Sequence, residues 1–386
     1  MNVAAPLAAA AAATLAPAHV VGRGAVSCFG RGRQALADAI FAGNLGVLPR
    51  VRTAAWDTPT EVAAEFPADL FAALGGGPDL ALRAAATAAH EALAEAGVAQ
   101  PDGIALVLAS TKGDLSGVLA GEPGNGLGLP ARLAERLARE LRLGPVLGTV
   151  SCACASGIVA LTSAARHLHA GTAERVLVVG VDVLHPFVMA GFGSLHALDH
   201  KACRPFDQAR RGVSLGEAAA AILLSRRAAG SIASIVGHGG ANDACHVTGP
   251  DRQGAGIALA ASRAIAGAGL QSGDIDVLHL HGTATVANDA TEAIGLGALF
   301  GGQTPPAFGT KGQTGHTLGA SGVLETILTI EALQRGSAPA NVGLERPDVD
   351  PALTLVRREQ RLDRAHLALK VASGFGGVQA AVVVRA

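Results

Sequence analysis

Short runs of β-branched and other apolar residues alternate with Ala- and Leu-rich stretches of helical period from about residue 19 to the end of the chain. In residues 80–97, apolar side chains recur on one helical face and a glycine follows the last of them. The predicted helices are residues 80–97, 156–169, 254–269, 288–300 and 319–336. The predicted strands are residues 103–110, 175–182, 219–225, 232–237, 277–281, 367–372 and 380–385. Strands that alternate with helices predict an α/β fold whose sheets are covered on both faces.

The pattern divides the 386 residues into three predicted parts. Residues 1–18 form an Ala-rich stretch without the basic start of a signal peptide, and we expect a flexible extension. An N-terminal half over residues 19–235 and a C-terminal half over residues 236–386 follow. In each half a loop with reactive residues precedes a helix of small residues, at Cys154 and at His316. This similarity between the two halves suggests an internal duplication.

Composition excludes several classes of protein. The 30 Lys and Arg nearly balance the 31 Asp and Glu, and aromatic residues make up only 3%, so neither a nucleic acid nor a membrane surface is an expected partner. Apolar residues at 49% and charged residues at 16% favour a large dry core, extended by a subunit interface. The five cysteines lack both the spacing of a disulfide framework and the CxxC pairs of a zinc site. We therefore expect no metal and a reducing cytoplasmic location.

One candidate loop, residues 149–157, reads TVSCACASG and leads into the helix predicted from Ser156. The positive end of that helix would favour a thiolate at Cys154, and its small neighbours would allow a sharp turn toward a ligand. Cys152 is expected one residue off on a strand and pointing to the other face. The alternative interpretation of Cys154 is a buried apolar cysteine without a chemical role.

A second candidate loop, residues 278–289, follows a predicted strand and reads LHLHGTATVAND. An imidazole at the end of a strand, here His281, is suited to polarise a carbonyl group. The hydroxyls of Thr283 and Thr285, two positions apart, are suited to bind an amide-bearing arm. The alternative interpretation is a helix cap with incidental histidines.

Two glycine-rich segments complete the candidates. Residues 309–322 contain His316, which lies 35 residues after His281, and Lys311, which we expect to pair with Glu292 one helix earlier. This segment lacks the order of residues of a phosphate-binding P-loop. The turn at residues 374–377, GFGG, has backbone amides that would suit an oxyanion hole.

One cysteine and two histidines from separate loops form a nucleophile and base arrangement of the acyl-transfer kind. The ordered motifs SCACASG, RPFDQARRG with LGE, HGTAT with ND, GTKGQTGH and GFGG resemble those of the 3-oxoacyl-carrier-protein synthases, the ketosynthases of the thiolase fold, over about residues 20–385. The pair of histidines is typical of the elongating branch, since initiating synthases use His and Asn. The resemblance implies a dimeric protein with a five-layer αβαβα core, built from two similar halves that each contain a mixed sheet covered by helices.

The resemblance also implies a role for each candidate residue. Cys154 matches the nucleophile that takes an acyl group from a carrier thioester. His281 and His316 match the pair that binds the malonyl thioester carbonyl and assists decarboxylation. The amides of Cys154 and Phe375 match an oxyanion hole. Three further matched pairs are the ion pair Lys311 and Glu292, the phosphopantetheine-binding Thr283 and Thr285, and the gate residues Phe192 and Phe375. The carrier-docking candidates His196 and Arg211 rest instead on the local positive charge that binding of a commonly acidic carrier protein requires.

Several positions depart from the family pattern. Val371, Ser373 and Gln379 stand where relatives often have Asn, Phe and Asn. His196 stands where housekeeping relatives often carry a carrier-binding Arg, and the loop near residues 121–129 is short. These changes favour a specialised polyketide, polyene or pigment pathway over housekeeping fatty-acid elongation.

The expected activity is that of an acyltransferase of the 3-oxoacyl-carrier-protein synthase type, which condenses a malonyl unit with a Cys-bound acyl chain and releases CO₂. No cofactor is expected to be bound, because phosphopantetheine arrives on the acyl carrier protein. The expected assembly is a homodimer, or a heterodimer with a second ketosynthase-like subunit. Two alternatives are a non-catalytic, chain-length-determining partner subunit and a thiolase.

Overall fold

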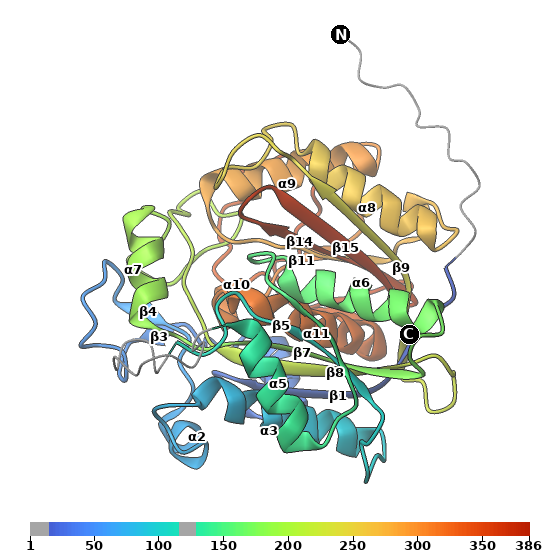
Figure 1. Cartoon of the computed structure of the whole chain (residues 1–386). Helices are drawn as coiled ribbons and strands as arrows, with labels where there is room; N and C mark the ends of the chain where they lie inside the picture. Colours follow the sequence, from blue (N-terminus) through green and yellow to red (C-terminus); the bar gives the residue numbers. More distant parts are fainter. Residues whose placement is uncertain (1–14, 116–128) are drawn as a thin grey trace.

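The computed structural model describes residues 15–115 and 129–386 (Figure 1). Most of the predicted flexible extension and of the shortened loop near residues 121–129 lies outside these described ranges. The described end of the extension packs on the fold, since Leu15 N donates to Gly267 O over 3.1 Å and Ala18 begins the first strand. Within the described ranges, no helix has both the length and the apolar composition needed to cross a membrane.

The elements follow one another in the α/β order that the sequence predicts. The strands are β1 (Ala18–Ser27), β2 (Gly30–Arg31), β3 (Leu48–Pro49), β4 (Val62–Ala63), β5 (Ala105–Ala109), β6 (Val146–Val150), β7 (Arg175–Asp182), β8 (Ala218–Ser225), β9 (Ala233–Asn242), β10 (Val277–His279), β11 (Ala307–Phe308), β12 (Ser337–Ala338), β13 (Gln360–Arg361), β14 (Leu367–Gly374) and β15 (Val378–Arg385). The helices are α1 (Arg33–Phe41), α2 (Ala68–Ala73), α3 (Leu80–Glu95), α5 (Pro130–Leu141), α6 (Ser156–His169), α7 (Pro186–Ser194), α8 (Ala255–Gly267), α9 (Val286–Leu299), α10 (Lys311–Thr314) and α11 (Ser321–Arg335), with short 3₁₀ turns at Ser272–Asp274 and Leu318–Ala320.

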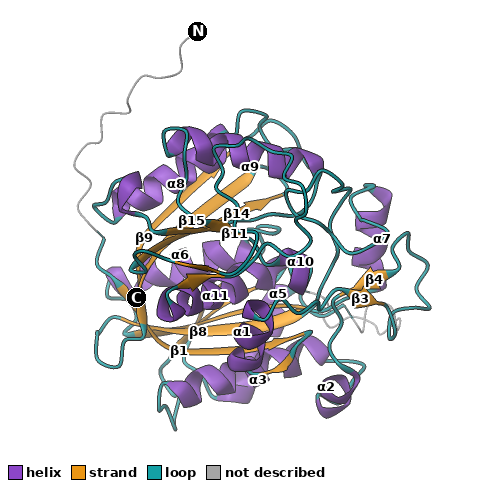
Figure 2. Ribbon diagram, turned by 180° about the vertical axis from the view of Figure 1, so that it is seen from behind, coloured by secondary structure: helices purple, strands orange, loops and turns teal. Residues whose placement is uncertain are grey.

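Two sheet regions enclose a central pair of helices (Figures 1 and 2). The N-terminal region has the strand order β1-β8-β7-β5-β6 and the C-terminal region the order β9-β15-β14-β10-β11, and β1 pairs with β9 where the two regions meet. Helices α6 and α11 pack between the regions, α3 and α5 cover the outer face of the first, and α8 and α9 cover the second. The expected five-layer αβαβα arrangement of the thiolase fold is thereby confirmed, whereas the division at residues 235 and 236 stays a prediction.

The apolar pattern explains why these segments occupy the interior. Strand β8 is buried at all eight positions, and small alanines in its first half allow helices to approach the sheet on both faces. Helix α6 and strand β7 coincide with the predicted residues. Strand β10 ends two residues earlier than predicted, at His279, and α9 begins two residues earlier, at Val286, so that a loop of six residues lies between them. The sequence pattern did not reveal β1, α5, β6 or α7.

The central helices touch through a pair of glycines. Each helix begins with Ser-Gly, and a Cβ atom added to Gly157 of α6 would lie 2.8 Å from the Gly322 Cα and 2.7 Å from the Val323 N of α11. Four residues before each glycine, Ala153 and Leu318 have left-handed φ angles of 48° and 51°. The same local geometry thus occurs once in each half, which supports the duplication that the sequence hints at.

This contact predicts that Gly157→Ala is destabilising. The added methyl group would overlap the backbone of α11, and overpacking of this kind costs about 1–3 kcal/mol. Thermal unfolding should show a lowered midpoint for Gly157→Ala. Gly191→Ala in α7 is the matched control, because nothing lies within 4 Å of the position that its methyl group would take, and alanine is favoured over glycine inside a helix by about 0.5–1 kcal/mol. Equal midpoints for the two variants would contradict the close contact.

Candidate active site

A cavity of about 350 Å³ opens between the two halves and collects almost all of the predicted site residues. The predicted residues that line it are Cys154, Phe192, His196, Arg211, His281, Thr283, Thr285, His316 and Phe375. Lys311 and Glu292 do not line the cavity but lie buried behind it. Loops that are far apart in the sequence therefore meet at one site, as predicted.

Cys154 lies on the tight turn between β6 and α6. Ser156 holds this turn, since its hydroxyl accepts a hydrogen bond from Cys152 N (2.9 Å) and donates one to Ala153 O (2.6 Å). The turn is also covered by the β14–β15 hairpin, where a Cβ atom added to Gly374 would lie 3.3 Å from Cys154 N. Cys152 is only half-buried and does not line the cavity. It lies in the turn rather than on a strand, because β6 ends at Val150.

The pKa of Cys154 is raised to about 12, mainly because the thiol is buried, and nearby Asp182 adds to this. Lys311 and a hydrogen bond from the Phe375 backbone lower this pKa, but they do not offset the burial. The expected lowering of the Cys154 pKa by the end of α6 is therefore wrong: desolvation of the thiolate outweighs the helix end. At physiological pH the group is a neutral thiol, and its reaction must move the proton elsewhere.

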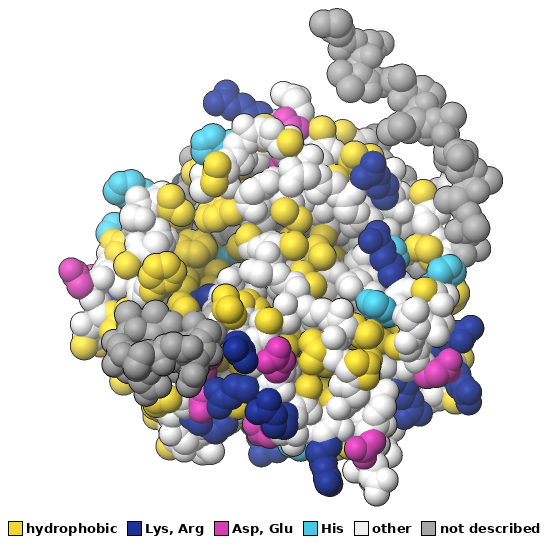
Figure 3. All heavy atoms as spheres, in the orientation of Figure 1, with side chains coloured by type: hydrophobic (Ala, Val, Ile, Leu, Met, Phe, Trp, Pro, Cys, Tyr) yellow, Lys and Arg dark blue, Asp and Glu magenta, His cyan; other side chains and the backbone are white. Residues whose placement is uncertain are grey.

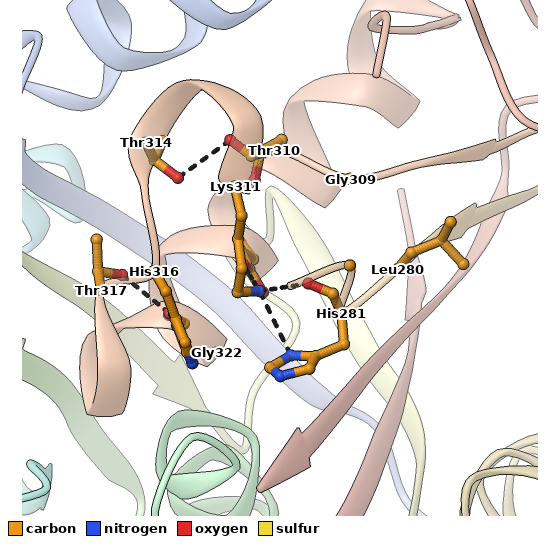
Figure 4. A network of polar contacts seen from close by, with 12 residues as sticks. Leu280, His281, Gly309, Thr310, Lys311, Thr314, His316, Thr317 and Gly322 are labelled. Atoms are coloured by element: carbon orange, nitrogen blue, oxygen red, sulfur yellow. Dashed lines mark hydrogen bonds and ion pairs between the residues drawn. The ribbon is translucent and has the colours of Figure 1, made fainter. Parts of the chain in front are cut away.

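His281 presents a fixed tautomer to the cavity. Its Nδ1 atom lies 3.4 Å from Lys311 Nζ, which can only donate, so the ring hydrogen is on Nε2 (Figure 4). Lys311 Nζ also donates to His281 O over 2.6 Å, and His281 N donates to Glu292 Oε1 over 2.6 Å. The pKa of His281 lies well below 6.5 because the ring is buried and Lys311, His316 and Lys370 surround it with positive charge.

His316 has the same tautomer, but different hydrogen-bond partners fix it. Leu318 N donates to its Nδ1 atom over 3.3 Å, so Nδ1 is an acceptor and Nε2 carries the hydrogen. Ser321 Oγ lies 3.0 Å from the same Nδ1 atom. Among the described residues Nε2 has no partner. Burial, Lys311 and Lys370 hold the pKa of His316 well below 6.5. The two imidazoles, whose ring centres are 5.4 Å apart, are thus neutral N–H donors at one site.

Lys311 is paired with Glu325 and not with Glu292, so the expected ion pair is wrong. Lys311 Nζ lies 2.5 Å from Glu325 Oε1, and Lys370 Nζ lies 2.6 Å from Glu325 Oε2. Glu292 instead accepts hydrogen bonds from the backbone N–H groups of His281 and Gly282, over 2.6 and 2.9 Å. Glu292 thus shapes the loop backbone, while Glu325 on the central helix α11 faces the lysines.

Sequence reasoning missed Glu325, Lys370 and Asp182, which support the site from behind. The first two are charged residues inside apolar segments, GVLETILTI and LALKVAS, and that anomaly was the available signal. Asp182, at the end of β7, accepts hydrogen bonds from Ser110, Thr111, Lys112 and Gly319. It therefore ties the loop after β5 to the turn that follows His316.

The remaining predicted residues surround the cavity mouth. The hydroxyls of Thr283 and Thr285 lie 2.9 Å apart, and the rings of Phe192 and Phe375 stack with centres 5.8 Å apart. Arg211 is exposed. On the face seen in Figure 3, apolar side chains gather beside α7, which carries Phe192, and the exposed apolar residues include Phe187, Leu195 and Val286. Among the described residues, no group of three or more His, Cys, Asp or Glu could hold a metal ion.

Comparison with known proteins places this cavity in a family context. Residues 17–229 match the beta-ketoacyl synthase N-terminal domain, and residues 232–345 match the beta-ketoacyl synthase C-terminal domain. The chain is 35% identical over 252 residues to 3-oxoacyl-(acyl-carrier-protein) synthase II, chloroplastic, of Arabidopsis thaliana; this covers 61% of the chain and 46% of that relative. It is 33% identical over 327 residues to nodulation protein E of Rhizobium meliloti, which covers 78% of the chain and 81% of that relative.

A solved structure is similar over nearly the whole chain. The ishigamide ketosynthase/chain length factor superimposes with a TM-score of 0.86 and 27% identity, over 96% of this chain and 99% of that one. By contrast, the chain spans only about half the length of the Arabidopsis relative.

The tautomers and lowered pKa values predict that His281 and His316 stay neutral in mildly acidic solution. Spectra of the ¹⁵N-histidine-labelled protein should show both rings with the hydrogen on Nε2, unchanged between about pH 8 and about pH 6. His281→Asn and His316→Asn variants would assign the two sets of signals. Titration of either ring near 6.5 would contradict the burial and the effect of the lysines.

The raised pKa of Cys154 predicts slow alkylation that accelerates with pH. With a pKa of about 12, the rate of modification by iodoacetamide should rise about tenfold per pH unit between about pH 7 and about pH 10, because the thiolate is the reactive form. Peptide mapping of the wild-type and Cys152→Ala proteins would follow the site itself. A plateau near pH 8 would mean that the thiol is activated in the free protein.

Proposed function

Because this chain belongs to the beta-ketoacyl synthase family, we propose that it extends an acyl chain by decarboxylative Claisen condensation. The substrates are an acyl thioester and a malonyl thioester, each delivered by an acyl carrier protein. The products are a 3-oxoacyl thioester, CO₂ and one free carrier thiol, with uptake of one proton. The observation that carries this proposal is that one cavity holds a cysteine and two neutral imidazoles whose ring hydrogens are on Nε2.

In the first step the sulfur of Cys154 attacks the carbonyl carbon of the acyl thioester. A bond forms between that carbon and Sγ, the bond to the pantetheine sulfur breaks, and the thiol proton passes to the departing sulfur. Because burial favours the neutral thiol, this proton transfer accompanies the attack. Lys311 lowers the pKa of the thiol and so favours the negative charge that develops on Sγ.

In the second step the malonyl thioester carbonyl accepts hydrogen bonds from Nε2 of His281 and of His316. The bond between the methylene carbon and the carboxylate breaks, CO₂ leaves, and the electron pair stays as an enolate. Two neutral donors stabilise this charge as it develops. The enolate carbon then attacks the acyl group on Cys154, whose oxygen is held by the amides of Cys154 and Phe375. Collapse of this intermediate expels the Cys154 thiolate, which takes up a proton.

The partner we propose is an acyl carrier protein, whose phosphopantetheine arm enters past the stacked Phe192 and Phe375 and binds Thr283 and Thr285. His196 and Arg211 at the mouth are the docking candidates. The chain itself holds no cofactor in this scheme. A solved relative described as a ketosynthase/chain length factor supports a heterodimer beside the homodimer, and Cys154 makes the chain the catalytic member of such a pair.

We assign the activity to a specialised polyketide, polyene or pigment pathway. Ser373 and Gln379, which replace the usual Phe and Asn, hydrogen-bond to each other over 2.6 Å at the base of the Phe375 hairpin. Gln379 also donates to Asp243 over 2.8 Å. The wall beside the gate therefore carries a polar network, and this network supports the assignment to a specialised pathway.

The proposal predicts that the two partial reactions separate by mutation. Cys154→Ala should abolish both acylation and condensation. His281→Ala and His316→Ala should retain acylation of Cys154 but lower condensation by about 100-fold or more, because each removes a donor to the developing enolate. Intact-protein mass spectrometry with a panel of acyl carriers measures acylation, and trapping of the 3-oxoacyl product measures condensation.

The matched control is Cys152→Ala, which removes a neighbouring thiol outside the cavity and should leave both reactions unchanged. Condensation at normal rates by both histidine variants would rule out this mechanism. Absence of any acylation of the wild-type protein, alone or with a second ketosynthase-like subunit, would rule out the proposed function.

A further inference from the structure

His279 is a fully buried histidine that the proposed mechanism does not use. It ends β10, two residues before His281, and its side chain has no exposed surface. Its ring lies against Phe308, its register partner on β11, with ring centres 4.3 Å apart. A buried imidazole in an otherwise apolar strand must have polar partners to offset its desolvation.

One partner of His279 lies on helix α11 and the other directly precedes helix α10. Its Nδ1 atom is 2.9 Å from Thr329 Oγ1 of α11, and its Nε2 atom is 3.4 Å from Thr310 Oγ1, directly ahead of α10. Thr329 Oγ1 already donates its only hydrogen to Glu325 O over 2.7 Å. Therefore His279 Nδ1 must be the donor in the first contact, and Nε2 is left as the acceptor for the Thr310 hydroxyl.

These two helices carry the ion pair that holds His281. Thr310 immediately precedes Lys311, and Thr329 lies one helical turn after Glu325. Lys311 in turn contacts both the carbonyl oxygen and the Nδ1 atom of His281. A shift of α10 relative to α11 would thus change the contact that fixes the tautomer of His281.

We infer that His279 is a positioning residue, which ties Thr310 to Thr329 and so keeps Lys311 and Glu325 in register beneath His281. The inference rests on the proposed function, because it assigns His279 a role through one of the two histidine donors. The pKa of His279 lies well below 6.5, owing to burial and to Lys370 and Lys311. The hydrogen-bonded bridge from Thr310 through His279 to Thr329 is therefore neutral and keeps one tautomer. It adds no charge beside the lysines.

Loss of the bridge should change the electrostatic environment of His281 and therefore its pKa. The charged and titratable groups around His281 are Lys311 of α10, Lys370 of β14, Glu292 of α9, Glu325 of α11, Cys154 ahead of α6 and His316 ahead of α11. Lys311 is the nearest cation and lowers the pKa of His281. When α10 is loosened, this pKa should rise toward 6.5, and the neutral form that donates to substrate should be lost at higher pH than in the wild type.

The test uses two variants that break the bridge. His279→Leu removes both hydrogen bonds while keeping an apolar side chain, and Thr329→Val removes the Nδ1 partner. In each, the His281 signal of ¹⁵N-histidine-labelled protein should titrate at least about one pH unit higher than in the wild type. The acid limb of the condensation rate should move up by the same amount, while acylation of Cys154 persists. The double variant should behave like either single variant.

Two further variants distinguish positioning from packing. In His279→Asn the amide nitrogen takes the place of Nδ1, so the contact to Thr329 should return while the contact to Thr310 stays broken. The pKa of His281 should therefore lie between those of the wild type and of His279→Leu. Phe308→Leu removes the ring stacking but no hydrogen bond, so it should lower the melting temperature without moving the His281 titration.

An unchanged His281 titration in both His279→Leu and Thr329→Val overturns the inference, and so does an equal shift in Phe308→Leu. If His279→Leu does not fold, Thr329→Val and His279→Asn decide the question alone. Because the titration needs no turnover, a wild-type protein that fails to condense would refute the proposed function without refuting the bridge.

Discussion

The contact between Gly157 and Gly322 is the constraint on which the arrangement of the site depends. The two central helices begin with these glycines as their second residues, and any side chain there would separate their first turns. Cys154 lies three residues before Gly157, and His316 lies six residues before Gly322. Bringing the helix starts together therefore brings the cysteine and a histidine to one cavity, although 162 positions separate them in the chain. The left-handed Ala153 and Leu318 let the chain turn sharply into each helix.

Behind this contact, one carboxylate joins the two buried lysines of the site. Glu325 is 2% exposed and lies between two lysines that have no exposed surface. Isolated charges at such depth would be very costly, and here each lysine contacts a carboxylate oxygen and backbone carbonyls. The pKa of Lys370 is nevertheless lowered to about 8 by burial. The lysines together with burial keep three histidines neutral, which is the protonation state that lets Nε2 donate to a carbonyl oxygen.

Secondary-structure elements and motif residues that follow from short sequence patterns could be predicted from the sequence. The partners of buried charged side chains could not, because they depend on which side chains the fold brings together. The continuous apolar run at Arg175–Asp182 and the helical face of Ser156–His169 gave elements with the observed ends. Motif order led to Cys154, His281 and His316, which line one cavity. The partner of Lys311 was misassigned to Glu292, because proximity along the chain says nothing about which buried carboxylate faces a lysine. Glu325 belongs to no motif, and only its place in an apolar helix set it apart.

The pKa of Cys154 also depends on burial, which the local sequence pattern does not show. A cysteine ahead of a helix suggests an activated thiolate, but the fold that brings it to the histidines also removes it from water. Desolvation then outweighs the attraction of Lys311 and the Phe375 amide. A protected neutral thiol suits the proposed thioester substrate, since it resists alkylation and oxidation in the free protein until that substrate binds. In the proposed reaction, reactivity then depends on the arriving substrate, whose departing sulfur accepts the proton that the buried site cannot release to solvent.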